Sequence, residues 1–434
     1  MWTLGGRLRL RNRLATRTPG LPRRARGRVG GACPDAPGRG VLGVFAVCVC
    51  VAVALTGVQG AIGARVRAPK PRAHAHKAFE EFPIPPSNAK PDAITAGRDG
   101  NLWFTEGAAN EIGRITPSGR ISQFRIPTAN STPFGIVAGP DGNLWFTEYS
   151  ANKIGRITPS GAIREYPIPT ANSAPNQIAA GPDGNLWFTD APSQIGRITP
   201  SGTISEFPLP VPKSGPAGIA PGPDGNVWFA ENIGHRIGRI TPSGTISEFP
   251  IPTPESFPLT ITPGPDGNLW FTVTGAKKIG RITPSGAISE YSMPTGEGSP
   301  LGMTAGPQGD LWFTDTGNSI GRITPSGKVS QFPLPTEEAS PQAITAGPRG
   351  TLWLTELYAN AIVRVEPRLL EGCVVPKLVG KTLARAKQLL RRAHCGLGIV
   401  ANPFKLKGKL VVVVQRPDPK TVLPAGTKVS VRLG

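Results

Sequence analysis

The sequence predicts an all-β protein: a seven-bladed β-propeller closed by an N-terminal strand and followed by a small α+β module. A repeat of about 42 residues, four strand signals within each copy and a match between the two ends of the array predict this fold. A repeat of this length cannot bury its own hydrophobic face, so the copies must stack or close into a ring. Each copy contains a near-repeat of G-P-D-G-N-L-W-F-T-E, and the tryptophans that mark the copies are Trp103, Trp145, Trp187, Trp228, Trp270, Trp312 and Trp353.

Residues 216–257 show the strand pattern of one copy. A short apolar strand at 217–220 leads into P-D-G-N, which is a tight-turn signal, and a second strand follows at 227–231. The third strand is expected at 236–241, and P-S-G then turns into a fourth at 245–251. Four antiparallel strands in about 42 residues are typical of a propeller blade.

The ends of the array predict how the ring closes. The seventh copy stops at 361–367 and lacks its fourth strand, whereas residues 79–85 (F-E-E-F-P-I-P) match the fourth-strand sequence E-F-P-I-P at 248–252. We therefore expect the N-terminal strand to complete the last blade, which would leave only short protected edges. The propeller is predicted to span residues 79–367.

The positive charge lies at the two ends of the chain. Residues 1–72 hold 14 basic residues and one acid, residues 368–434 hold 14 and two, and the repeat body is mildly acidic. A nucleic-acid-binding propeller would need a basic face on the folded body, so no nucleic-acid partner is expected. Basic ends suit a membrane-flanking segment and contact with an anionic cell envelope.

The N-terminal region predicts export. Residues 1–64 form a basic leader in which 41–58 are uncharged and mostly apolar, as in a signal peptide or a signal anchor. Small residues at 58–60 favour cleavage, and 65–78 form a basic, proline-rich linker. The protein is expected outside the cell or in the cell envelope, with membrane contact only through this N-terminal segment.

The repeat resembles the virginiamycin B lyase-like propellers over roughly residues 79–367. The resemblance rests on G-P-D-G-N-L-W-F-T-E, N-K-I-G-R-I-T-P-S-G and I-x-E-[FY]-P-I-P, which recur in the blades. It implies a carbon–oxygen lyase that opens a cyclic depsipeptide of the streptogramin B type by Mg²⁺-dependent elimination. It also implies a histidine directly after a blade-opening proline as general base, with nearby glutamates holding the metal.

Acidic residues end the second strand of six blades and are candidate ligands for Mg²⁺. The start of the first strand and the end of the second are neighbours in an antiparallel pair, so these acids are expected on one face of the ring, around the channel. Alternatively, they belong to the scaffold and pair with an arginine of the third strand, such as Arg156 or Arg239. The metal candidates are Glu106, Glu148, Asp190, Glu231 and Glu356.

Residues that vary between blades on the same face are candidates for ligand binding. The position after each blade-opening proline provides a polar arc and an apolar arc of Ala217, Leu259 and Leu301. Such a rim suits an amphipathic ligand, although drift at exposed positions explains the variation equally well. The ligand-binding candidates are Asp92, Phe134, Tyr149, Asn176, Gln342 and Tyr358.

The catalytic pattern of the lyases is missing. None of the seven positions after a blade-opening proline is histidine, and no glutamate immediately precedes any of those prolines. His235, in a loop between the second and third strands, is the single propeller histidine and a weak candidate for a general base. The sequence therefore favours a non-catalytic protein, with Mg²⁺ as cofactor only if the lyase interpretation holds.

Residues 368–434 resemble a PASTA domain, through V-P-x-L-x-G-x-x-x-x-x-A near their start and L-P-x-G-T-x-V near their end. The resemblance implies contact with peptidoglycan, and a helix at 384–393 carrying Lys387, Arg391 and Arg392 could meet an anionic wall polymer or simply be solvated. Cys373 and Cys395 are expected to form a disulfide in the oxidising exterior, the alternative being buried free thiols.

We thus expect an exported, wall-associated propeller that binds a peptide, glycan or small amphipathic ligand on its channel rim. The PASTA domain would contact peptidoglycan. The alternative is the Mg²⁺-dependent lyase.

Overall fold

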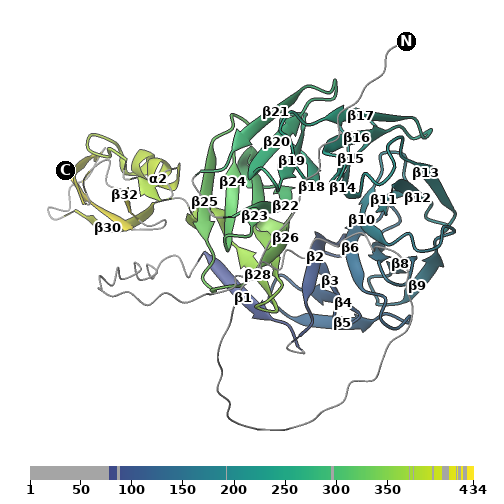
Figure 1. Ribbon diagram of the computed structural model, residues 1–434. Helices are drawn as coiled ribbons and strands as arrows, with labels where there is room; N and C mark the ends of the chain where they lie inside the picture. Colours follow the sequence, from purple (N-terminus) through teal and green to yellow (C-terminus); the bar gives the residue numbers. More distant parts are fainter. Residues whose placement is uncertain are drawn as a thin grey trace, which may run out of the picture. The chain divides into compact units, whose positions relative to one another are not determined.

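The computed structural model describes residues 78–434 except 86–87, 192, 295–297, 371, 375, 393–394, 403–409, 417, 419–421 and 424–427. Seven four-stranded antiparallel sheets follow one another along the chain, and their first strands surround a common centre (Figure 1). This confirms the all-β propeller. The predicted leader, with its apolar segment 41–58, lies outside the described residues.

Six blades are formed by consecutive strands. Blade 1 contains β2 (Pro91–Ala96), β3 (Leu102–Glu106), β4 (Glu111–Ile115) and β5 (Ile121–Arg125). Blade 2 contains β6 (Pro133–Ala138), β7 (Leu144–Glu148), β8 (Lys153–Ile157) and β9 (Ile163–Pro167). Blade 3 contains β10 (Pro175–Ala180), β11 (Leu186–Asp190), β12 (Gln194–Ile198) and β13 (Ile204–Pro208). Blade 4 contains β14 (Pro216–Pro221), β15 (Val227–Glu231), β16 (Arg236–Ile240) and β17 (Ile246–Pro250), close to the predicted bounds.

The last three blades continue the pattern. Blade 5 contains β18 (Pro258–Pro263), β19 (Leu269–Val273), β20 (Lys278–Ile282) and β21 (Ile288–Ser292). Blade 6 contains β22 (Pro300–Ala305), the 3-10 turn η2 (Pro307–Gly309), β23 (Leu311–Asp315), β24 (Ser319–Ile323) and β25 (Val329–Pro333). Blade 7 contains β26 (Pro341–Ala346), η3 (Pro348–Gly350), β27 (Leu352–Glu356) and β28 (Ala361–Val365).

The chain closes the ring as predicted. Strand β1 (Phe79–Pro83) pairs antiparallel with β28, from Phe79 opposite Val365 to Pro83 opposite Ala361. It thereby supplies the missing fourth strand of blade 7. The sheet order is β1-β28-β27-β26.

Each tryptophan that recurs in the repeat lies between two blades. Trp145 is fully buried and stacks on Tyr166 at 5.4 Å between ring centroids, while its indole Nε1 donates to the turn residue Asp141 at 3.0 Å. It also packs against Leu186 and Phe188 of blade 3. Burying large aromatic surfaces between neighbours is what a repeat of this size needs, because one blade alone leaves that surface exposed.

The third-strand arginines do not pair with the second-strand acids, contrary to the scaffold pairing considered from sequence. Arg156 lies opposite Trp145 in the strand register, at the other end of the strand from Glu148. Its guanidinium lies 5.6 Å from the Trp145 ring centroid and 3.8 Å from Asp141. Equivalent pairs are Arg239–Asp224, Arg281–Asp266 and Arg322–Asp310. The arginines therefore fix the turns on the face opposite the acids.

Glycine in the third strand makes room for the phenylalanine of the second. A Cβ on Gly155 would lie 2.1 Å from the Phe146 ring. Blade 7 replaces both residues at once, with Leu354 opposite Val363. In blade 7 the second-strand side chain is smaller and the third-strand side chain is larger than in the other blades, so the core stays filled, as expected for a densely packed interior.

The C-terminal module has its own core and is an α+β structure, as predicted. It follows α1 (Pro367–Leu370) and contains β29 (Cys373–Val374), α2 (Leu383–Arg392), β30 (Gly396–Ala401), β31 (Val412–Arg416), β32 (Val422–Leu423) and β33 (Lys428–Leu433). Strand β33 lies between β30, which is parallel to it, and the antiparallel β31. Ala386 and Leu390 of α2 pack with Val412, Val429 and Val431.

The predicted disulfide stays a prediction. Cys395 is buried in the core of the C-terminal module, whereas the side chain of Cys373 lies outside the described part of the chain.

Within the described residues, no helix has both the length and the apolar character needed to cross a membrane.

Candidate functional site

The candidate site lies on the face where each inner strand begins. Pro133 opens β6 and lies opposite Glu148, the last residue of β7. In every blade the opening proline pairs in this way with the last residue of the second strand, which is acidic in six blades and is Val273 in blade 5. The residue after each proline and the acid at the end of the second strand therefore share one face, as the antiparallel pattern predicted. The inner strands that begin on this face surround the common centre of the ring, and the second strands that carry the acids lie next to them (Figure 1).

Threonines of the second strands fix the start of each inner strand. The Thr147 hydroxyl accepts a hydrogen bond from Gly135 N at 2.8 Å and donates to the Asn176 carbonyl of the next blade at 2.6 Å. Five other blades repeat this bridge, and the bulge that starts each inner strand accompanies it. Blade 4 has Ala230 in this position, so the hydroxyl is missing there.

The second-strand acids are enclosed within their blades. Glu106, Glu148, Asp190, Glu231 and Glu356 are all 0% exposed. Two acids meet an amide of the fourth strand: Gln123 donates to Glu106 at 2.7 Å, and Gln331 donates to Asp315 at 3.0 Å. The carboxyl groups thus lie against the interior of the blade, where burial disfavours their charged form.

In four blades the partner on the fourth strand is itself a glutamate. Burial and then the neighbouring Glu165 raise the pKa of Glu148 to about 8. Burial followed by the charge of Glu81 raises the pKa of Glu356 to about 8. Burial is also the main cause that raises the pKa values of Glu106, Asp190 and Glu231 to about 7. A carboxyl pair of this kind can share a proton at neutral pH.

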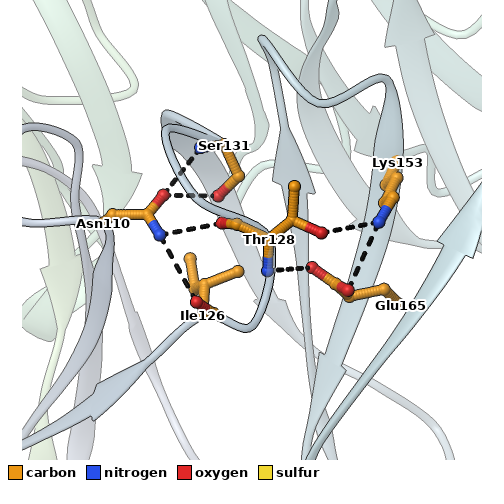
Figure 2. A network of polar contacts seen from close by, with 6 residues as sticks. All are labelled: Asn110, Ile126, Thr128, Ser131, Lys153 and Glu165. Carbon is orange, nitrogen blue, oxygen red and sulfur yellow. Dashed lines mark hydrogen bonds and ion pairs between the residues drawn. The ribbon is translucent and has the colours of Figure 1, made fainter.

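The fourth-strand glutamates also hold the loops between blades, a role that the sequence analysis missed. Figure 2 shows Thr128 donating through its backbone N to Glu165 at 3.1 Å, while Lys153 contacts Glu165 at 3.3 Å and donates to the Thr128 hydroxyl at 2.6 Å. On the other side, Asn110 Nδ2 donates to the Thr128 carbonyl at 2.9 Å, and Asn110 Oδ1 accepts from Ser131 N at 2.7 Å. The recurring E-[FY]-P signal could have indicated this role.

His235 occupies a loop position with a structural role. Asn110, Asn152 and Asn360 hold the equivalent place before the third strand in other blades, and all have positive φ, as His235 does at 54°. The His235 Nδ1 accepts a hydrogen bond from Phe257 N at 3.3 Å, and the two rings meet edge to face at 4.6 Å. These contacts shape the loop. The imidazole is half-buried, and its Nδ1 is already bonded within the protein rather than free for a substrate.

The rim candidates are accessible to different degrees. Asp92, Phe134, Asn176 and Gln342 are half-buried, and Phe134 lies 6.5 Å from Tyr149 between ring centroids. Tyr358 is 61% exposed, whereas Ala217 of the predicted apolar arc is buried. Burial raises the pKa of Asp92 to about 7. Exposed Ile233 and Phe257 were missed. The only sequence signal for Phe257 is that it directly precedes a blade-opening proline, where the other blades have a polar or small residue, whereas the loop of Ile233 also carries a tyrosine in blades 2 and 7.

The described residues do not fit a Mg²⁺ site on this rim. Mg²⁺ needs several oxygen ligands that converge in near-octahedral geometry. Among the described residues, no three His, Cys, Asp or Glu side chains form a group that could hold a metal ion. Each proposed acid lies buried in a separate blade, so the set predicted from sequence is not gathered around a common point.

Comparison with known proteins identifies the family. The virginiamycin B lyase family matches residues 69–194 and 191–370. The chain belongs to this family. A PASTA domain matches residues 374–434 and suggests cell-wall contact and a location outside the cell or in its envelope.

Solved lyases agree with this assignment. A streptogramin B lyase structure is 42% identical, with a TM-score of 0.64, over 66% of this chain and 97% of that chain. Virginiamycin B lyase from Staphylococcus aureus is 42% identical over 66% of this chain and 98% of its own, with a TM-score of 0.63. A catalytically inactive variant of that lyase with quinupristin matches at the same identity and coverage, with a TM-score of 0.64.

Proposed function

We propose that this member of the virginiamycin B lyase family is an exported, wall-associated binding protein that has lost the lyase chemistry. The proposal rests mainly on the positions after the seven blade-opening prolines, none of which is histidine. A general base typically contributes a factor of about 10²–10⁴ to the rate. The enclosure of the second-strand acids gives further support, because buried carboxyl groups in separate blades cannot converge on one cation.

The proposed ligand site is the rim of the channel. Phe134, Tyr149 and Tyr358 offer apolar surface, and Asp92, Asn176 and Gln342 offer polar groups, so a peptide, a glycan or a small amphipathic molecule fits their chemistry. Isothermal titration calorimetry with quinupristin and with soluble peptidoglycan fragments tests this. Tyr358→Ala and Phe134→Ala should weaken binding several-fold. Ile399→Ala, at an exposed apolar residue of the C-terminal module, is the control.

The PASTA domain is proposed to bring the protein to peptidoglycan. Sedimentation with purified cell wall tests this for the chain from residue 73 onward, the proposed exported form. Lys387→Glu on α2 should reduce the bound fraction, whereas Lys213→Glu on a propeller loop makes the same change of net charge and should not. Equal binding of all three proteins would contradict the proposed role of α2.

The second candidate is a Mg²⁺-dependent carbon–oxygen lyase acting on a cyclic depsipeptide. Identity of 42% over nearly the full length of a streptogramin B lyase favours it. It would require a base other than histidine at the blade openings. The proposed domain bounds, 79–367 for the propeller and 368–434 for the PASTA domain, apply to both candidates.

A further inference from the structure

The turn between β26 and β27 in blade 7 has an arginine and lacks the aspartate that every other blade carries there. In the first five blades this turn holds an aspartate, and four of the five accept from the tryptophan Nε1 at 3.0 Å, the fifth at 3.2 Å. Blade 6 places Asp310 in the turn, 3.7 Å from Arg322. Blade 7 instead reads G-P-R-G-T, with Arg349 and Thr351. The turn therefore carries an aspartate in six blades, whereas in the seventh it carries an arginine and no acid.

The surrounding contacts adjust to this change. Trp353 Nε1 donates to the Thr351 hydroxyl at 3.0 Å, so a neutral oxygen replaces the carboxylate. Arg364 lacks a turn carboxylate and contacts Glu80 of β1 instead. It keeps the bond to a proline carbonyl, here Pro117 at 2.9 Å, that the third-strand arginines of blades 1 to 4 also make. Arg349 is exposed and has no carboxylate within ion-pair distance in the described part of the chain. In blade 7 the turn thus has no carboxylate to balance the charge of its arginines.

A cavity of about 300 Å³ opens at this turn. Its lining includes Arg349, Arg364 and Arg368, together with Thr351, Trp353 and Pro117. Glu366 also lines it and lies 3.2 Å from Arg368. The lining thus has three guanidinium groups and one carboxylate, and Glu80 lies beside Arg364. The net charge around the cavity is therefore positive.

We propose that this cavity binds an oxyanion, a carboxylate or phosphate group, between Arg349 and the other two arginines. Guanidinium groups present planar forks of N–H donors that match both anions, and the Thr351 hydroxyl adds a polar group. A volume of about 300 Å³ is at the small end for ligand pockets and larger than a bare anion needs. The ligand is therefore a small organic anion or the charged group of an anionic polymer.

The test uses a variant that the repeat itself supplies. Arg349→Asp with Thr351→Asn recreates the G-P-D-G-N turn of blades 2 to 5, so the variant should fold, and its melting temperature checks this. Binding of acetate, inorganic phosphate and soluble polyphosphate is measured by thermal shift and calorimetry at constant ionic strength. Bound anion should raise the melting temperature by mass action.

We expect saturable binding to the wild type and at least a tenfold weaker affinity in the double variant. Lys213→Asp, on the opposite face of the propeller, makes the same change in charge as Arg349→Asp and should leave binding unchanged. Binding of the small anions would identify a small organic acid or phosphate as the ligand class, and binding of polyphosphate alone would identify an anionic chain. The proposal is overturned if none of the probes binds, if the double variant binds as well as the wild type, or if Lys213→Asp weakens binding equally.

Discussion

Replacing Glu148 with glutamine tests whether blade 2 holds a buried, protonated carboxyl group. Burial and the neighbouring Glu165 raise the pKa of Glu148 from 4.5 to about 8. An acid whose pKa is raised by folding contributes stability that is complete below its unfolded pKa and is lost as the pH rises through its folded pKa. The window therefore runs from about pH 4.5 to 8. Glutamine is neutral throughout this pH range, so the stability of the variant lacks this pH dependence.

The size of the effect follows from the displacement of the pKa. At ~1.4 kcal/mol for each pH unit, a rise from 4.5 to about 8 corresponds to roughly 5 kcal/mol. Relaxation of the site and entry of water reduce this limit, and we expect about 2–4 kcal/mol. Blades 1 and 6 show that an acid–amide pair fits the same space, with Gln123 bonded to Glu106 and Gln331 bonded to Asp315.

Urea denaturation followed by tryptophan fluorescence at pH 5, 7 and 9 measures the effect. The free energy of unfolding of the wild type, relative to Glu148→Gln, should fall by about 2–4 kcal/mol between pH 5 and 9. The buried acids of the other blades titrate in both proteins and cancel in this difference, whereas Glu165 is coupled to Glu148 and is part of the measured effect. Glu255→Gln, at an exposed loop residue, is the control and should give a difference that does not change with pH. A pH-independent difference for Glu148→Gln would refute the argument.

Three further variants test packing and the loops. Gly155→Val should lower the free energy of unfolding by about 3 kcal/mol because the added Cβ meets the Phe146 ring. Adding Phe146→Leu should recover part of that loss, because blade 7 has the same combination in Leu354 and Val363. If chemical denaturation shows that the losses of the two substitutions simply add, the compensation is contradicted. Ala230→Thr should give blade 4 the pair of threonine hydrogen bonds that Thr147 makes in blade 2, and should stabilise the protein by about 0.5–1.5 kcal/mol. A lower melting temperature would contradict this. His235→Asn, the residue at this place in other blades, should change stability by less than about 1 kcal/mol and leave ligand binding intact, and calorimetry checks both.

The fold could be predicted because the sequence repeats its own constraints. The tryptophan spacing, the turn signals and the match of 79–85 to a fourth strand predict blade number, strand order and closure, and the pairing of β1 with β28 confirms them. The pairing of arginine with the second-strand acid was wrong because spacing alone does not tell which end of a strand two residues share. Arg156 lies opposite Trp145, so it meets the turn aspartate instead.

The site was harder to predict because burial depends on the third strand. Glu148 ends its strand, and its place on the rim suggested a ligand, yet its side chain is fully buried. In blade 1 a Cβ on Gly113 of the third strand would lie 2.6 Å from a carboxylate oxygen of Glu106, so glycine at this position leaves room for the buried acid. The role of Glu165 as a loop anchor depends on contacts with Thr128 and Lys153, which no single repeat displays. Comparison among the repeats singled out His235, for which the structure shows contacts that shape a loop, but it did not single out the arginine in the turn of blade 7.

One assay tests most directly the claim that this propeller binds without catalysing elimination. The chain from residue 73 onward is incubated with Mg²⁺ and quinupristin, and the products are separated by chromatography with mass detection. The account predicts unchanged substrate at all times. A new peak of the same mass that disappears with a chelator would contradict it and establish an eliminating lyase, and a peak heavier by one water would contradict it by showing hydrolysis.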